Sequence, residues 1–323
     1  MEPQSCAILF YKGIYAIIEN QMKNTTPDLT ADRVSTPLLI MVIFVQQLID
    51  GLAYPVARYG LLAVEPFTYA FFRFIISSAV LMTVVKVRKT KGVPIEKKDI
   101  PRIIKLGILT VLFNQTAYLF GQRLTAAGHG SVLFATAPIW LFVGGIIFFK
   151  EKFSMRRTIG IVLGLTGVAF IVTSGAIKVG VQYLVGDLII MGAVFNWVIY
   201  TILCRPLAAK YGVFRITAYT LTAGSVVYFP FGLYHALRFN YSGVPLGAWF
   251  SILYMALGLS VGYYVLTNWL MRHMETTRMA VFLNFQPVIA AVVAYIFLGE
   301  GFGWPFVLGW VTVLAGIIVT ESR

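Results

Sequence analysis

Long apolar runs follow one another along almost the whole chain, with only short polar links between them. A run of about 20 apolar residues crosses the hydrocarbon core of a bilayer as an α-helix. Ten such runs occur, at residues 38–57, 66–85, 103–121, 129–149, 157–174, 187–204, 214–236, 246–270, 279–298 and 304–320. Because the runs are continuous rather than alternating between apolar and polar residues, a transmembrane β-barrel is excluded. The pattern predicts an all-α integral membrane protein with ten transmembrane helices.

Composition places the chain in the membrane rather than in solution. Hydrophobic residues make up 59% and charged residues 12%, with a mean hydropathy of +0.81, whereas soluble domains carry about 25% charged residues. Residues 1–36 precede the first run, and we expect them to form a cytoplasmic tail. Their apolar stretch Cys6–Ile18 is interrupted by Lys12 and lacks a small-residue cleavage site, so a signal peptide is not expected. The two cysteines, Cys6 and Cys204, give no disulfide framework.

The positive charges are distributed unevenly between the two sides of the predicted helices. The net charge is +13, and 21 of the 26 Lys and Arg residues lie in the tail, the C-terminus and the links after the even-numbered runs. The links after the odd-numbered runs hold four, Arg58, Arg123, Lys178 and Arg238, and Arg73 lies within a run. Cytoplasmic links of membrane proteins carry such an excess of Lys and Arg. We therefore expect a multi-pass protein of the cell (inner) membrane with both termini cytoplasmic, and no binding of nucleic acid.

One segment of the chain recurs 149 residues later without a gap. Val132–Phe170 and Val281–Val319 share eleven identical positions, among them a Pro, a Glu and two Gly in register. Self-similarity at a fixed offset indicates internal duplication. We expect one five-helix repeat at 37–175 and a second at 185–320.

The two predicted repeats face opposite ways across the membrane. Each holds five spans, an odd number, so the second repeat enters from the other side. The repeated glutamate reflects this, because Glu151 lies among basic residues in Lys150–Arg157, whereas Glu300 lies among glycines in Leu298–Pro305. Inverted repeats place a substrate site near the bilayer midplane, between halves that give alternating access. The architecture therefore indicates transport.

The repeated residues have both structural and functional interpretations. Glu151 and Glu300 each precede a new run, where a carboxylate caps a helix N-terminus; the alternative is proton coupling. Pro138 and Pro287 each free a backbone carbonyl, which makes them simple kinks, hinges or cavity-lining positions. The repeated glycines permit close helix packing, either within a monomer or across a homodimer.

These features resemble a known family. Gly121–Phe170 and Arg272–Val319 are similar to two EamA domains of the drug/metabolite transporter superfamily, each with an Arg/Thr-rich link, a helix with a central Pro, a Leu/Phe-x-Glu turn and a Gly-spaced helix. The likeness covers about residues 38–320 and includes Phe72-Arg73-Phe74 in the second run and Asp187, Trp197, Tyr200 and Arg205 in the sixth. It implies a ten-helix secondary transporter, commonly an exporter of amino acids or other small metabolites. The Trp-Gly pair usual in the first helix of the family is Asp50-Gly51 here.

Polar side chains inside apolar runs are costly in a membrane and mark candidate functional positions. In the first run, the spacing of Gln47, Asp50 and Tyr54 puts all three on one helix face. Asp50 lies a little past the centre of its span, where a carboxyl can bind a proton in one state and release it in another. The alternative is a structural Asp50 that bonds to Arg73 or to a neighbouring amide.

Polar and aromatic residues four positions apart recur in three further runs. The pairs are Asn114 with Tyr118, Asn196 with Tyr200, and Tyr264 with Asn268, and the fourth and ninth runs add Trp140 and Asn284. Their amide and phenol groups are suited to orient a small organic molecule, and their rings to receive its apolar part. Alternatively, the amides join helices, or two of the tyrosines belong to the aromatic belt of the interface. We expect these residues, with those of the first run, to line a polar cavity that binds substrate.

Three further kinds of polar residue indicate supporting roles. Arg73 lies about seven residues from the outer end of its run, within snorkelling reach of the interface, and we expect it to anchor or gate. Asp187 is expected to interact with the helix dipole at the start of the sixth run. His129, His235 and His273 lack ligand spacing, so no metal site is predicted.

The predicted function is secondary active transport, with export of small organic metabolites such as amino acids by alternating access. Two alternatives stay open, a lipid or lipid-linked-carrier flippase of the same fold and a proton-independent metabolite exchanger. The chain contains neither HExxH nor a G-x-S-x-G with candidate partners, so an enzyme is not expected. It contains no P-loop, so it does not hydrolyse ATP itself, and no cofactor is predicted.

Overall fold

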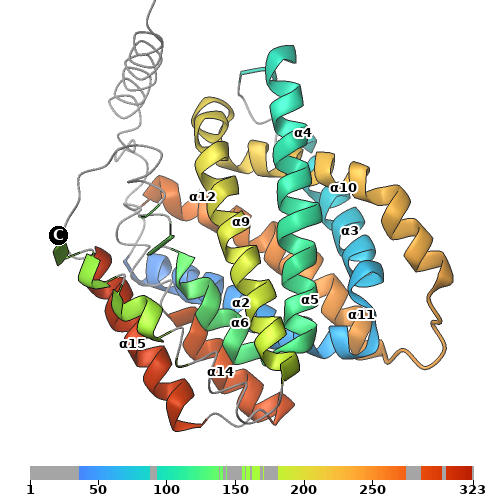
Figure 1. The fold of residues 1–323 in the computed structure, drawn as a ribbon. Helices are drawn as coiled ribbons and strands as arrows, with labels where there is room; N and C mark the ends of the chain where they lie inside the picture. Colours follow the sequence, from blue (N-terminus) through green and yellow to red (C-terminus); the bar gives the residue numbers. More distant parts are fainter. Residues whose placement is uncertain are drawn as a thin grey trace, which may run out of the picture.

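The computed structural model describes residues 36–87, 93–137, 139–140, 143, 155–156, 158–160, 162–167, 170, 181–273, 285–299 and 303–321. Throughout this part, helices joined by short links make up the fold (Figure 1). In chain order the elements are α2 (Thr36–Ala63), α3 (Pro66–Val87), η1 (Lys97–Asp99), α4 (Ile100–Ile108), η2 (Leu109–Gln115), α5 (Thr116–Leu124), α6 (Ala127–Ala135), α9 (Val181–Tyr211), α10 (Val213–Arg238), α11 (Leu246–Leu253), η3 (Tyr254–Tyr263), α12 (Tyr264–His273), α14 (Phe285–Leu298) and α15 (Trp304–Glu321).

Six helices of the described part are long and apolar enough to cross a membrane. They are Pro37–Ala63, Pro66–Val87, Lys97–Leu124, Tyr183–Tyr211, Val213–Arg238 and Leu246–Thr267. Thr158–Gly167 and Trp304–Gly316 are shorter apolar helices. The almost entirely helical membrane fold is therefore confirmed. The predicted runs at 129–149, 157–174 and 279–298 fall partly outside the described residues.

Two helices are longer than the apolar runs that predicted them. α2 ends at Ala63 rather than at residue 57, and α9 covers 181–211 rather than 187–204. The runs mark where side chains are apolar enough for lipid, whereas a helix continues as long as its backbone hydrogen bonds are made internally. α2 contains Pro55 and α9 contains Pro206, so neither proline ends its helix.

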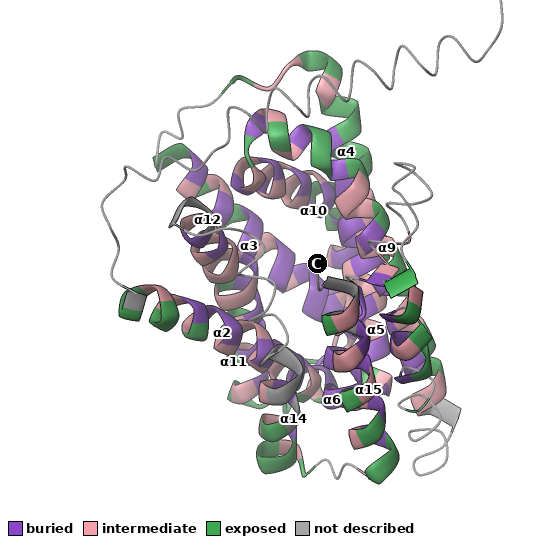
Figure 2. Ribbon diagram, turned by 90° about the vertical axis from the view of Figure 1, so that its left-hand side faces the viewer, coloured by how far each residue is buried: buried purple, intermediate pink, exposed green. Residues whose placement is uncertain are grey.

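The outer surface of the helices is apolar. Large side chains such as Leu237, Phe297 and Trp304 are 76–79% exposed, and buried residues face the interior (Figure 2). A monomeric protein in water rarely exposes large continuous apolar patches. Contact with lipid chains explains this surface, as the composition predicts.

Glycines bring two pairs of helices into close contact. On α4 and α10, a methyl group added at Gly224 would lie 2.2 Å from the carbonyl oxygen of Gly107. Because that oxygen belongs to the backbone, it cannot turn aside as a side chain does. The crossing of α4 and α10 therefore requires glycine at this point.

The repeated glycines form the second close contact. A methyl group at Gly167 would lie 2.5 Å from the carbonyl oxygen of Gly309, and one at Gly316 would lie 2.6 Å from that of Gly160. The helical segment around Gly160 thus packs against α15 of the same chain, beside it in Figure 1. Of the two alternatives for these glycines, the structure shows packing within the chain. From the first contact to the second, the residue number increases in one segment and decreases in the other. The two segments are therefore antiparallel.

Two π-helical segments interrupt otherwise regular α-helices. η2 lies between α4 and α5, and η3 lies between α11 and α12. A π turn breaks the usual pattern of backbone hydrogen bonds, and hydroxyl groups fill part of the gap. The hydroxyl of Thr116 donates to the carbonyl oxygen of Val111 at 2.9 Å, and that of Ser260 donates to Met255 at 3.0 Å. Such segments are often found at functional sites.

Ion pairs fix the link before α4 to the end of α9. Lys210 Nζ lies 2.6 Å from Glu96 Oε1 and 2.8 Å from Asp99 Oδ2, and the Tyr211 hydroxyl donates to Asp99 at 2.5 Å. Hydrogen bonds from Lys210 and Lys98 hold the pKa of the Glu96 carboxyl below its usual range. These contacts join two ends of helices that the charge distribution assigns to the cytoplasmic side.

We predict that Gly224→Ala destabilises the protein by about 1–3 kcal/mol, because the added methyl group overlaps the α4 backbone. Gly192→Ala on α9 is the matched control, since nothing lies within 4 Å of the added group. Removal of a helical glycine there should be neutral or slightly stabilising. Thermal unfolding in lipid nanodiscs measures both. Equal melting temperatures for the two variants would show that the α4–α10 crossing tolerates a side chain.

Candidate functional site

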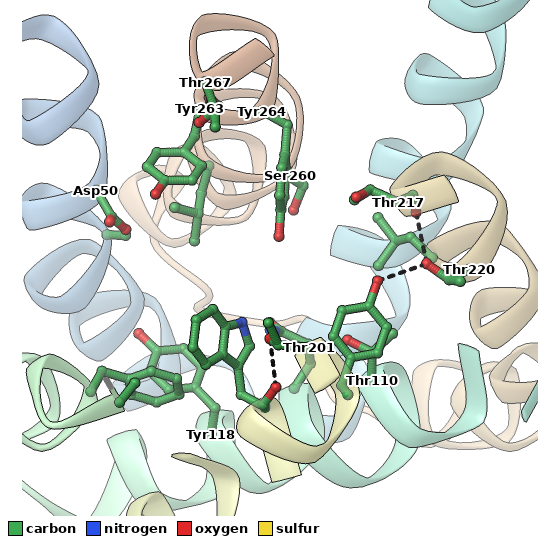
Figure 3. Close-up of a pocket in the computed structure, with 18 of the residues that line it drawn as sticks. Asp50, Thr110, Tyr118, Thr201, Thr217, Thr220, Ser260, Tyr263, Tyr264 and Thr267 are labelled. Atoms are coloured by element: carbon green, nitrogen blue, oxygen red, sulfur yellow. Dashed lines mark hydrogen bonds between the residues drawn. The ribbon is translucent and has the colours of Figure 1, made fainter. Parts of the chain in front are cut away.

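A cavity of about 460 Å³ lies among α2, α3, η2, α5, α6, α9, α10, η3 and α12 (Figure 3). Its volume is in the range of small-molecule sites, about 300–1,000 Å³. The lining combines one carboxyl and one guanidinium group with many hydroxyl and aromatic groups. These polar and aromatic residues are Asp50, Tyr54, Arg73, Thr110, Gln115, Tyr118, Phe134, Trp197, Tyr200, Thr201, Thr217, Thr220, Ser260, Tyr263, Tyr264 and Thr267.

The acidic side of the cavity belongs to α2. Asp50 and Tyr54, one turn apart, both line it, as the spacing predicts. Asp50 projects from α2 beside the residues of η3 and α12, across the cavity from Thr217 and Thr220 (Figure 3). Gln47 is buried but does not belong to the lining, and its Oε1 has no hydrogen-bond partner among the described residues. The structure therefore brings two of the three residues of the predicted face to the cavity and leaves Gln47 outside it.

The basic side of the cavity belongs to α3. Arg73 is only 3% exposed and lines the cavity, with its guanidinium 5.7 Å from the centre of the Phe74 ring. Arg73 thus lies in the cavity wall rather than at the interface within its reach, and the anchoring or gating role stays a prediction. α3 packs between α10 and η3, and this packing turns the helix face that carries Tyr69, Arg73 and Ser77 inward.

Aromatic rings close one part of the cavity wall. Tyr54 and Tyr118 meet edge to face at 6.0 Å, and Phe134 meets Tyr118 in the same way at 5.5 Å. On the α9–α10 side, the hydroxyls of Tyr200 and Thr220 lie 3.1 Å apart, and Thr220 donates to the carbonyl oxygen of Ile216 at 2.9 Å. These contacts hold phenol groups at the cavity surface in fixed positions.

Besides Gln47, three predicted residues lie outside the lining. Asn114 is fully buried, and its Nδ2 donates to the carbonyl oxygen of Ala193 on α9 at 2.6 Å. Trp140 Nε1 donates to Thr136 Oγ1 at 3.1 Å. Asn196 Oδ1 is buried and has no partner among the described residues. Asn114 thus joins η2 to α9. This contact matches the alternative that amide side chains form hydrogen bonds between membrane helices.

The reason for the difference at Asn114 is local geometry. Four-residue spacing puts Asn114 and Tyr118 on one face of a regular α-helix, but Asn114 lies in η2 and Tyr118 in α5. The wider π turn changes the register between them. On the regular helix α9, the lining face consists of Trp197, Tyr200 and Thr201, and Asn196 falls beside it.

Sequence reasoning missed most of the hydroxyl groups that line the cavity. Ser260, Tyr263 and Thr267 follow a 3–4–7 spacing together with the predicted Tyr264, and Thr217 and Thr220 are three apart. Clustered hydroxyl residues at helical spacing are the signal that was available for them.

Several predicted residues cannot be placed. Pro138, Glu151, Asn284 and Glu300 lie outside the described residues. Asn268 belongs to α12 and Pro287 to α14, but their side chains are likewise outside what the structure describes.

A second buried polar cluster lies away from the cavity. Asp187 accepts a hydrogen bond from the Thr125 hydroxyl at 2.5 Å and lies 3.0 Å from His129 Nδ1. The ring of His129 stacks on Phe306 of α15, with centroids 5.3 Å apart. Asp187 was expected to interact with a helix dipole; however, α9 begins at Val181, so Asp187 lies beyond the first turn and bonds to other helices instead.

The chain matches the sequence model of the EamA-like transporter family over residues 37–173 and 184–321. The chain belongs to this family. It is 27% identical over 273 residues to an uncharacterized transporter of Archaeoglobus fulgidus, which covers 82% of this chain and 91% of that protein. It is 24% identical over 226 residues to a protein of Streptantibioticus cattleyicolor named "Probable terminal-alkyne amino-acid exporter", with 70% and 74% covered.

A solved crystal structure has the same fold as this EamA-like chain. The TM-score is 0.59 at 17% sequence identity, and the match covers 88% of this chain and 96% of the other. The family and the relatives together indicate a membrane transporter of small molecules rather than an enzyme.

We predict that Asp187→Asn destabilises this EamA-like protein by about 1–3 kcal/mol, because an amide cannot accept hydrogen bonds from Thr125 and His129 as a carboxylate does. Thermal unfolding of Asp187→Asn, Thr125→Val and the double variant forms a double-mutant cycle. We expect the two substitutions to be non-additive. Additive effects would show that the Thr125–Asp187 contact contributes nothing to stability.

Proposed function

We propose that the protein is a secondary active transporter that exports small organic metabolites, such as amino acids, by alternating access. The observation that carries this proposal is the cavity, which is lined by residues of both sequence halves and holds charged groups inside the membrane-spanning part. Ionisable side chains at this depth are costly and are typically retained for transport.

We further propose that the two halves are inverted five-helix repeats. The glycine contacts support this, because Gly160 meets Gly316 and Gly167 meets Gly309. Gly160 and Gly309 are equivalent positions of the two repeats, as are Gly167 and Gly316. Exchanging the two repeats therefore turns one contact into the other, as a two-fold axis between antiparallel segments requires. The π-helices add support, since a shift of η2 by 149 residues gives 258–264, which overlaps η3.

The extent of the cavity supports export from the cytoplasm. It reaches Thr201, Val213, Thr217 and Thr267, near helix ends that the distribution of Lys and Arg assigns to the cytoplasmic side. A cavity that reaches this side is placed to receive substrate from inside the cell.

Contacts between α2, α3, α10 and α11 support closure on the opposite side. The Tyr69 hydroxyl lies 2.6 Å from Ser251 Oγ, and Ser251 also donates to the carbonyl oxygen of Val56 at 2.6 Å. Towards the outer end, the ring of Phe67 packs against Phe120 and Phe231. These contacts would have to open for the substrate to leave the cell.

We predict that the purified protein, reconstituted in liposomes with an acidic lumen, takes up amino acids in exchange for protons, and that Asp50→Asn abolishes this uptake. Among the described residues, no hydrogen bond or ion pair holds the Asp50 carboxyl, so it is available to carry a proton. Asn cannot release one, yet it should still permit exchange of labelled for unlabelled substrate.

Glu96→Gln, which neutralises a half-buried carboxyl outside the cavity, is the control and should transport normally. Proton-driven uptake by Asp50→Asn at the wild-type rate would remove Asp50 from the coupling mechanism. Absence of uptake and of exchange across an amino-acid panel in the wild type would contradict amino-acid transport itself.

We predict opposite accessibility for the two repeated glutamates. In a variant with Cys6 and Cys204 replaced by Ser, Glu151→Cys should react with a membrane-impermeant maleimide only from the cytoplasmic side. Glu300→Cys should react only from the outside. Labelling of intact cells and of inside-out vesicles measures this. Reaction of both from the same side would contradict the inverted arrangement.

A further inference from the structure

The structure places a buried cation without a counter-ion on the cavity wall. Arg73 is 3% exposed, and its Nε and Nη1 have no hydrogen-bond partner among the described residues. It is also the sole Lys or Arg among the described residues that line the cavity. A buried arginine normally directs its five N–H donors at acceptors.

The carboxyl group of Asp50 does not serve as this counter-ion. Asp50 and Arg73 line the same cavity, but no ion pair joins them. Tyr118 and Tyr264 line the same cavity as both charges. The two charges thus stay unpaired on α2 and α3, in a cavity that also exposes phenol groups.

An unpaired guanidinium in such surroundings is unfavourable. Removing a charge from water costs several kcal/mol unless a partner of opposite charge and hydrogen bonds replace the water. Phe74 supplies a ring at 5.7 Å but no negative charge. A ligand that brings an anionic group into the cavity would provide what the fold does not.

Resting on the proposed function, we infer that Arg73 binds the carboxylate of the transported molecule, and that the substrates are small monocarboxylates with an aromatic or apolar body. A guanidinium matches a carboxylate by two parallel hydrogen bonds. A phosphate or dicarboxylate carries more negative charge than this single cation balances. The rings of Tyr54, Tyr118 and Trp197 line the same cavity and are suited to an aromatic body.

Four related probes separate the groups that the cavity recognises. L-phenylalanine carries a carboxylate and an amine, 3-phenylpropionate only the carboxylate, and phenethylamine only the amine. L-phenylalaninamide replaces the carboxylate of the amino acid by a neutral amide. Binding to the purified full-length protein is measured by thermal shift and by titration at constant ionic strength, with sodium chloride and sodium phosphate as inorganic anions.

We expect L-phenylalanine and 3-phenylpropionate to raise the melting temperature of the wild type, and the amine and the amide to have little effect. Arg73→Gln should weaken carboxylate binding by about 10- to 100-fold. Arg73→Lys should retain part of the affinity, because it keeps the charge but loses the planar fork. Arg123→Gln, which neutralises an exposed arginine on α5, is the matched control and should bind as the wild type does.

A structural role of Arg73 makes a different prediction. If the arginine only stabilised the fold, Arg73→Gln would lower the melting temperature without ligand, and Arg73→Lys would bind carboxylates normally. We expect the reverse, since removal of an uncompensated buried charge relieves a cost. Should Arg73→Gln fail to fold, the affinity of Arg73→Lys decides the question.

Three results would overturn the inference. One is equal binding of the amide and the carboxylates by the wild type, and the second is unchanged carboxylate binding in Arg73→Gln. The third is carboxylate binding by the wild type that is absent or no stronger than the binding of chloride or phosphate. These binding measurements do not depend on transport. If carboxylates bound to the protein but liposomes containing it moved none, the inference about Arg73 would stand and the proposed transport function would be contradicted.

Discussion

The absence of water in the hydrocarbon core determines most of this structure. A polar group there has no solvent partner, so the backbone of each span is helical, and an interior polar side chain is stabilised by a partner elsewhere in the protein. Gln46 does so by donating to Thr267 at 2.6 Å, Ser78 by donating to Ser225 at 2.8 Å, and Asn114 by donating to the backbone of α9. These bonds connect elements far apart in the sequence and fix how the helices face one another.

The same constraint separates structural from functional polar groups. Asp187 and Asn114 are as deeply buried as any residue of the fold, yet partners on other helices satisfy them. Asp50 and Arg73 are held in no such way by the described residues, and both line the cavity. Burial alone therefore does not distinguish the two groups. Asp50 and Arg73 differ because they are charged groups that line the cavity without a partner among the described residues.

The sequence contains the helical membrane fold but only part of the site. Apolar runs reveal helices because the bilayer demands them, and Asp50 and Tyr54 could be placed because α2 is regular there. Asn114 could not, because whether a helix adopts π turns depends on packing against its neighbours rather than on local spacing. Arg73 could not either, since its distance from the helix end fits both snorkelling and burial. Contact of α3 with α10 and η3 decides between them.

The separation of Asp50 from Arg73 is itself informative. Two opposite charges in one low-dielectric cavity attract strongly, and a direct pair would satisfy both. The fold instead keeps them on different helices, in a cavity that Tyr118 and Tyr264 also line. Had they paired, a ligand would have to break the pair before it could bind either charge. The fold forgoes the stability of a direct ion pair, and Asp50 stays available to a proton and Arg73 to an anion. Such a loss of stability in favour of function is usual at active sites.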